Sequence, residues 1–159
     1  MPIVFVGKAE LKKIPIFGFF YKRICILVDR GSQSSRKEVY FSAKRRLKNG
    51  TSVAIFPEGL VPKENIILSP FKNGAFSLAI EHQIPIVPAT YFDCKRFFSW
   101  AFFKGRPGTI RVKQHKPIST KGFNAKNIKE IKDQTFAILL NDLSNDEVYM
   151  KDTNRLIHE

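Results

Sequence analysis

The sequence predicts an α/β fold with a mostly parallel central sheet flanked by helices, built as one domain over residues 1–159. From residue 24 to residue 91, short apolar runs alternate with helical patterns, which is typical of βαβ units. A chain of 159 residues with 43% hydrophobic residues fits one domain with a sizeable core. Cys25 and Cys94 have no CxxC spacing, so neither a disulfide framework nor a zinc site is expected.

The first half of the chain predicts three strands and the helices that connect them. Ser35 and Glu38 have the spacing of a capping box, which predicts a helix from there to the stop at Asn49-Gly50. Pro57 ends the strand that precedes Glu58. The predicted strands are 3–7, 24–28 and 52–56, and the short helical segments are 9–13 and 17–22.

The second half predicts two helices and two further strands. Phe136, Leu139, Leu140 and Leu143 follow the spacing of one helix face, so a helix is expected from about 127 to 149. The other predicted elements are a helix at 71–83, a buried strand at 85–91 and a strand at 109–113.

The charge of the chain indicates an anionic partner. Lys and Arg number 27 against 14 Asp and Glu, a formal net charge of +13, which suits nucleic acid, phosphate-bearing molecules or anionic lipid. No RNP-type strand, helix-turn-helix spacing or zinc ligand set supports nucleic acid, so none is expected as a partner, although a basic nucleic-acid-binding protein stays an alternative. The longest apolar run, 14–21, is too short to cross a bilayer, so any membrane contact is expected at the surface.

Charged residues follow the predicted strands at the points where the strands end. Arg30 follows the strand 24–28, Glu58-Gly59 follow the strand 52–56, and Lys72 opens the next helical pattern. Adjacent parallel strands end at the same edge of a sheet, so these residues are expected to face one crevice. Two cations near a helix N-terminus favour phosphate binding.

Several blocks of the sequence, in order and spacing, resemble the 1-acyl-glycerol-3-phosphate acyltransferases of the glycerolipid acyltransferase family. The resemblance covers about residues 3–120. The blocks are FVGKAELKKIPIFGFF (5–20), ICILVDR (24–30), IFPEG (55–59), SPFKNGAFSLAIEHQ (69–83) and IPIVPATY (84–91).

The resemblance implies transfer of a fatty acyl group from acyl-CoA or acyl carrier protein to 1-acyl-glycerol 3-phosphate, giving phosphatidate. It implies no cofactor and no metal beyond the acyl donor as co-substrate. It assigns substrate binding to Arg30, Glu58 and Gly59, and also to Lys72. Since Glu58 cannot neutralise a phosphate, its expected task is to hold a cation or a substrate hydroxyl.

The chain departs from the family in its catalytic block, a His followed five residues later by an Asp. His82 is followed at that spacing by Val87, and His115 by Thr120, so no His-x4-Asp occurs and no catalytic residue is predicted. The chain is therefore expected to be an N-terminally truncated member with little activity alone, since a positioned base contributes ~10²–10⁴-fold. A non-catalytic membrane- or phospholipid-binding module is the alternative. His82 is expected to be a surface histidine.

The segment 95–104, KRFFSWAFFK, places aromatic residues between cations. It fits either a packed hairpin edge or a patch in the lipid headgroup region, with Lys95, Arg96, Lys104 and Arg106 on anionic lipid. The second reading suits an enzyme whose acceptor lies in a bilayer. The expected location is therefore peripheral, at the cytoplasmic face of a membrane with an anionic surface.

Overall fold

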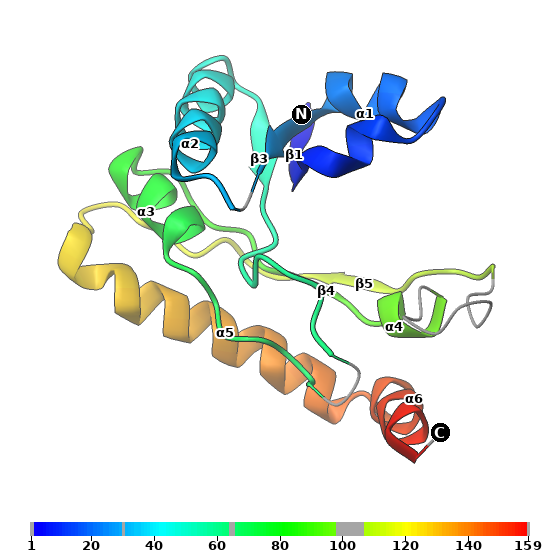
Figure 1. Cartoon of the computed structure of the whole chain (residues 1–159). Helices are drawn as coiled ribbons and strands as arrows, with labels where there is room; N and C mark the ends of the chain where they lie inside the picture. The colour runs from blue at the N-terminus through cyan, green and yellow to red at the C-terminus, as the bar shows by residue number, and fades with distance from the viewer. Residues whose placement is uncertain (1, 30, 64–65, 98–106, 159) are drawn as a thin grey trace. The chain divides into compact units, whose positions relative to one another are not determined.

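The computed structural model describes residues 2–29, 31–63, 66–97 and 107–158, which form helices and short strands (Figure 1). By internal contacts the chain divides into two compact units, Met1–Pro57 and Glu58–Glu159. The predicted α/β class with a parallel sheet is confirmed, while the prediction of one domain over 1–159 stays a prediction.

The first unit contains a parallel sheet of three strands in the order β2-β1-β3. β1 is its central strand, and Phe5 lies opposite Cys25 on one side and Ala54 on the other. Gly7 of β1 is required by packing, because a Cβ there would overlap the hydroxyl of Tyr21. The strand bounds are β1 Ile3–Lys8, β2 Cys25–Val28 and β3 Ser52–Ala54.

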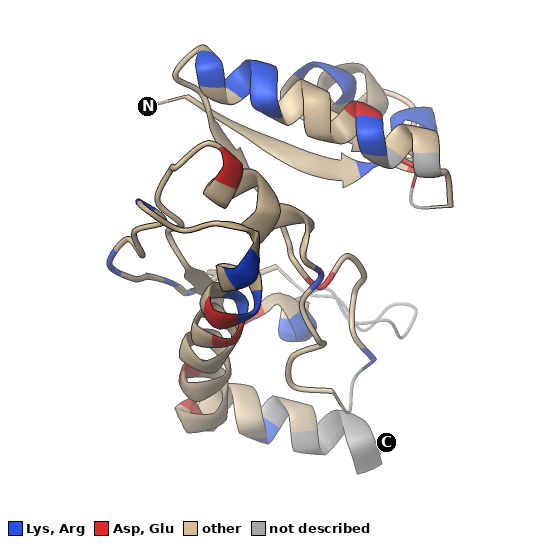
Figure 2. Cartoon of the chain, turned by 90° about the vertical axis from the view of Figure 1, so that its left-hand side faces the viewer, with Lys and Arg blue, Asp and Glu red and all other residues tan. Residues whose placement is uncertain are grey.

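The helices of the first unit are the 3-10 helix η1, α1 and α2, and Lys and Arg (blue) recur along them (Figure 2). The predicted N-cap of α2 is wrong: Ser32 caps the helix, its Oγ accepting from the Ser35 amide at 3.2 Å. Ser35 instead uses its hydroxyl to accept from the Asp29 amide at 2.9 Å. The bounds are η1 Ala9–Lys13, α1 Phe17–Ile24 and α2 Gln33–Lys48.

The second unit contains an antiparallel strand pair, β4 (Ala89–Tyr91) and β5 (Val112–Gln114). The predicted strand 85–91 is therefore too long, and it pairs with β5 rather than extending the parallel sheet among the described strands. Pro85 and Pro88 explain the difference, because proline has no N–H to donate to a ladder. Regular pairing begins only after Pro88, although Ile86 forms an isolated bridge with Ile118.

The core of the second unit lies where α3 packs on α5. Phe71, Phe76, Ile80 and Ile131 form a buried cluster, and the Phe136 ring contacts Phe71 edge-on at 5.0 Å. The predicted helix 71–83 is shorter in the structure, where it begins only after Asn73. The helices are α3 Gly74–Glu81, α4 Cys94–Phe97, the 3-10 helix η2 Ala125–Asn127, α5 Ile128–Asn145 and α6 Glu147–His158.

The predicted helix 127–149 is wrong at its end, because the helix is interrupted at Asp146, between α5 and α6. Asp146 has extended backbone angles, with φ −88° and ψ 107°. Its carboxylate accepts from the Tyr149 amide at 2.7 Å, as an N-cap aspartate does. The side chain of Asp146 therefore starts a new helix where the apolar spacing predicts a continuous one.

Candidate functional site

The loop after β3 holds the Glu58 carboxylate in a defined position. Its Oε2 accepts from the Ser69 amide at 2.7 Å, although eleven residues separate the two in sequence. Burial raises the pKa of Glu58, while hydrogen bonds from Ser69 and the charge of Lys95 lower it, and the net pKa is raised. Glu58 is thus a half-buried carboxylate whose charged form is incompletely compensated by the protein.

Gly59, the residue after Glu58, lies in contact with Lys72. Gly59 has φ +69°, a conformation that favours glycine. A Cβ at Gly59 would lie 3.1 Å from Cδ and Cε of Lys72 and 3.3 Å from its Nζ. The end of the Lys72 side chain therefore passes over the partly buried backbone of Gly59, and Lys72 lies two residues before α3 begins.

The structure thus places Lys72 against Gly59, which follows Glu58 in the sequence, while the role of these three residues in substrate binding stays a prediction. Arg30 lies outside the described residues, as do the aromatic and basic residues of 98–106. His82 is not a surface histidine: its side chain is 15% exposed, and Nε2 is buried 4.0 Å from the Glu81 carboxylate.

Two side chains from distant segments hold the stretch between Gly59 and Lys72. Lys95 Nζ of α4 donates to the Ile66 carbonyl at 2.6 Å. The Tyr149 hydroxyl of α6 donates to the Ile67 carbonyl at 2.8 Å. Burial raises the pKa of Tyr149 to about 12, so its hydroxyl keeps the proton that it donates.

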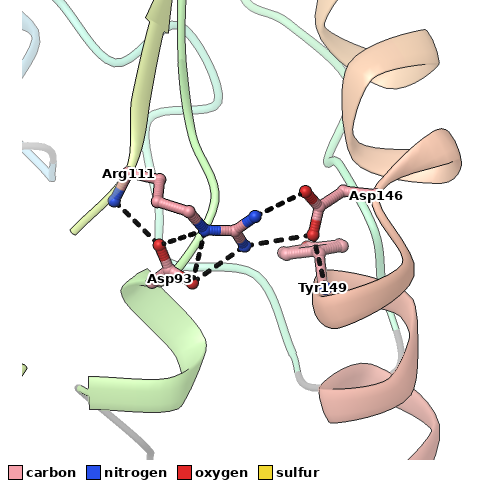
Figure 3. Close-up of polar contacts among 4 residues, drawn as sticks. All are labelled: Asp93, Arg111, Asp146 and Tyr149. Atoms are coloured by element: carbon pink, nitrogen blue, oxygen red, sulfur yellow. Dashed lines mark hydrogen bonds and ion pairs between the residues drawn. The ribbon is translucent and has the colours of Figure 1, made fainter. Parts of the chain in front are cut away.

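Arg111 joins this arrangement to the strand pair, as Figure 3 shows. Its guanidinium donates to Asp93 at 2.9 Å and to Asp146 at 2.7 Å, and its backbone amide donates to Asp93 at 2.8 Å. Asp146 in turn caps α6, which carries Tyr149. Burial opposes ionisation of Asp93, but the bonds from Arg111 outweigh it and lower the pKa. At Asp146 the Arg111 bond is the largest effect, and the pKa is again lowered.

A second polar cluster surrounds Asp142 of α5. Its carboxylate accepts from Lys113 Nζ at 2.6 Å and from Thr90 Oγ1 at 2.7 Å, and it contacts His115 Nε2 at 2.6 Å. Burial raises the pKa of Asp142, but these hydrogen bonds outweigh it and lower the pKa. The cluster ties the strand pair to α5, which fits a structural role.

Sequence reasoning missed both clusters, because their members lie far apart in the chain. Arg111 and Asp146 are 35 residues apart, and His115 and Asp142 are 27 apart. An Asp three residues before Tyr149, at the end of a long helical pattern, was the one local signal for the break at Asp146.

Metal-ligating clusters and membrane spans were sought in the described parts of the chain. There, no group of three or more His, Cys, Asp or Glu residues could hold a metal ion. Within the same residues, no helix has both the length and the apolar character needed to cross a bilayer. Cys25 and Cys94 are both free thiols.

Residues 1–92 match the protein-family model described as Acyltransferase. The 1-acyl-sn-glycerol-3-phosphate acyltransferase beta of Homo sapiens is 34% identical over 130 residues, covering 80% of this chain and 46% of the human protein. A 1-acyl-sn-glycerol-3-phosphate acyltransferase of Cocos nucifera is 31% identical over 149 residues, covering 88% of this chain and 46% of the coconut protein. The chain spans about half the length of the curated relatives it matches.

A solved structure shares the fold. The crystal structure of the 1-acyl-sn-glycerophosphate acyltransferase PlsC from Thermotoga maritima matches with a TM-score of 0.69 and 22% identity. The match covers 90% of this chain and 57% of the Thermotoga chain.

Proposed function

Because this chain belongs to the acyltransferase family, we propose that it carries the acceptor-binding residues for acyl transfer to 1-acyl-glycerol 3-phosphate, which gives phosphatidate. The acyl donor is acyl-CoA or acyl carrier protein. A thioester donor is already activated, so the proposal includes no further cofactor. Relatives that carry the name 1-acyl-sn-glycerol-3-phosphate acyltransferase support the choice of acceptor.

The contact between Gly59 and the end of Lys72 is the observation that carries this proposal. A glycine with positive φ leaves its backbone open to a ligand, and the adjacent ammonium group is a point charge suited to phosphate. The N-terminus of α3 follows directly, and its dipole favours an anion. A glycerol phosphate bound there has its phosphate at Lys72.

Glu58 suits the uncharged part of the same acceptor. Its carboxylate is fixed by the Ser69 amide at 2.7 Å and adjoins Gly59. A carboxylate repels phosphate but accepts a hydrogen bond from a glycerol hydroxyl. We therefore assign the substrate hydroxyl to Glu58 and the phosphate to Lys72, and we assign Arg30 to the phosphate on the family resemblance.

The chain alone is proposed to transfer acyl groups weakly, because no His-x4-Asp spacing occurs in its sequence. Loss of a positioned base lowers a rate by ~10²–10⁴-fold. A non-catalytic phospholipid-binding module would bind the same acceptor with the same residues. Measuring acceptor binding and acyl transfer separately distinguishes the two functions.

We propose a peripheral location at the cytoplasmic face of a membrane. The acceptor and the product are lipids, and the net charge of +13 attracts the chain to an anionic surface. No nucleic acid is proposed as a partner.

The test is a titration of the 15N-labelled chain with sn-glycerol 3-phosphate, followed by NMR. The Gly59 amide is expected to shift, and Lys72→Gln is expected to weaken binding about tenfold, the loss of one charge-assisted contact. Lys129→Gln is the matched control, because Lys129 lies on α5 and is 85% exposed. Equal affinity of the Lys72→Gln and Lys129→Gln variants would refute the phosphate assignment.

A companion assay measures transfer from oleoyl-CoA and from oleoyl-acyl carrier protein to 1-oleoyl-glycerol 3-phosphate. Binding with slow transfer supports the proposal that the chain holds the acceptor and lacks its base. Binding with no transfer from either donor favours the non-catalytic module. Transfer at an ordinary enzymatic rate would refute the proposal of weak activity.

A further inference from the structure

An apolar surface on the first unit has no part in the proposed acceptor site. It is formed by η1, α1 and the turn between them, residues 9–24, and is called the η1–α1 surface below. The helix is attached to its unit through Gly18 and Tyr21, which are buried. The large apolar side chains that it leaves exposed include Ile14, Ile16, Phe17, Phe19, Phe20 and Ile24.

Ile16 stands out within this surface. It has φ 62° and ψ −59°, and the Phe17 amide donates to the Pro15 carbonyl at 2.6 Å, which defines a γ-turn with positive φ. This turn is strained for any side chain and more so for a β-branched one. The strain serves no packing purpose, because the Ile16 side chain is 81% exposed. Strained backbone of this kind clusters at binding sites.

The η1–α1 surface also carries cations on both of its helices. Lys12 and Lys13 lie in the last turn of η1, and Lys22 and Arg23 lie in the last turn of α1. The Arg23 guanidinium lies 3.6 Å from the centroid of the Phe19 ring. Glu10 is the one acidic residue in the segment, and it pairs with Lys8 at 2.6 Å.

We propose that the η1–α1 surface docks the protein on a membrane that contains anionic lipid, with Ile16 inserted first. A short amphipathic helix that lies in the interface buries Phe and Ile side chains among the acyl chains while Lys and Arg contact lipid phosphates. The basic side chains have aliphatic stems long enough to reach the headgroups from a buried helix.

A second copy of this chain fits the same surface poorly. A two-fold interface brings identical patches together, so the four cations would face like charges across it. Lipid phosphates instead neutralise every one of them. The charge pattern therefore selects an anionic bilayer as the occupant.

This inference rests on the membrane part of the proposed function, and its test is vesicle co-sedimentation of the full chain. The vesicles contain either phosphatidylcholine alone or equal parts of phosphatidylcholine and phosphatidylglycerol. Wild-type protein is expected to bind the anionic vesicles and to bind phosphatidylcholine far more weakly. No binding to either would overturn both the membrane location and this inference, while acceptor binding and acyl transfer have their own assays.

Ile16→Gly separates docking from folding. Glycine tolerates positive φ, so the variant is expected to have a higher Tm than wild type. It also removes the inserted side chain, so the partition coefficient on anionic vesicles is expected to fall about tenfold. A more stable variant that binds vesicles as tightly as wild type would overturn the proposal and leave the membrane location intact.

Phe20→Ser and Phe41→Ser form a matched pair. Both side chains are exposed, Phe20 by 58% and Phe41 by 66%, and each ring contacts one aromatic neighbour edge-on. Phe41 lies on α2, outside the η1–α1 surface. Loss of vesicle binding in Phe20→Ser but not in Phe41→Ser supports the assignment, and equal losses contradict it. A wild-type dimer that Ile16→Gly dissociates, with vesicle binding unchanged, would make a second copy the occupant.

Discussion

Glu58 and Asp142 are two carboxylates of the same unit whose pKa values are shifted in opposite directions. Asp142 is 3% exposed and is contacted by Thr90, Lys113 and His115, so its pKa is lowered despite burial. Glu58 is half-buried and is hydrogen-bonded by Ser69, and burial prevails, so its pKa is raised. The hydrogen-bonding and charged partners of a carboxylate, more than its depth of burial, therefore decide whether its pKa is raised or lowered.

The difference separates a structural carboxylate from one suited to a ligand. The oxygens of Asp142 are occupied by donors from β4, β5 and the residue after β5, which hold the strand pair on α5. The carboxylate of Glu58 retains acceptor capacity, since an ionised carboxylate has about four lone-pair sites. Uncompensated charge of this kind costs stability and is characteristic of binding sites.

Replacement of the structural carboxylate is expected to have the largest effect. Asp142→Asn should lower the free energy of unfolding by about 3 kcal/mol, because the amide cannot compensate Lys113 and presents an N–H₂ group where an oxygen is needed. Urea unfolding followed by circular dichroism measures the change. Asp133→Asn is the control, since Asp133 is 54% exposed and pairs only across the surface of α5 with Lys129. Equal stability of the Asp142→Asn and Asp133→Asn variants would contradict the structural role of Asp142.

Lowering the pH should remove the stabilising contribution of the buried and partly buried aspartates. The pKa values of Asp93, Asp142 and Asp146 are lowered by folding. Their contribution to stability is therefore fully present above the unfolded-state pKa of about 4, and it is lost as the pH falls through the lower folded values. Unfolding experiments between neutral pH and strongly acidic pH should show this loss, and Asp142→Asn should show a shallower dependence than wild type. Identical slopes would mean that Asp142 is not the group that titrates.

Tyr149→Phe tests how the loop that carries Glu58 is held. The variant loses the 2.8 Å hydrogen bond to the Ile67 carbonyl and is expected to lower the free energy of unfolding by about 1 kcal/mol. Amide hydrogen exchange of Ser69 should accelerate while the amides of α5 keep their protection. Tyr40→Phe on α2 is the chemically matched control. Unchanged exchange at Ser69 would show that the loop is held without this hydroxyl.

Glu58→Gln should have the smallest effect and the opposite sign. Folding raises the pKa of Glu58, so its contribution to stability is present below the unfolded-state pKa and is lost as the pH rises through the folded value. Removing the charge at neutral pH should raise the free energy of unfolding slightly, since Gln Oε1 still accepts from Ser69 and solvent already screens the half-buried charge. Affinity for sn-glycerol 3-phosphate should fall in the same variant. A lower free energy of unfolding in Glu58→Gln would instead indicate that Glu58 has a structural role like that of Asp142.

The sequence by itself determined the family and the positions of several elements. The motif blocks predicted an acyltransferase, and the family match over residues 1–92 confirms that prediction. Three parallel strands, the stop at Asn49-Gly50 and the α3 core around Phe76 also follow from local patterns. Lys72 lies against Gly59, and Ser69 binds Glu58, but the shared substrate site of Arg30, Glu58, Gly59 and Lys72 stays a prediction.

Only the tertiary structure decided which distant partners complete these elements. The pairing of β4 with β5 and the contacts of Arg111 join residues that are 18 to 35 positions apart. Many charged pairs in a basic chain are equally compatible with its local propensities, and packing selects among them. The exposure of Ile16 and its positive φ are likewise visible only in the folded chain.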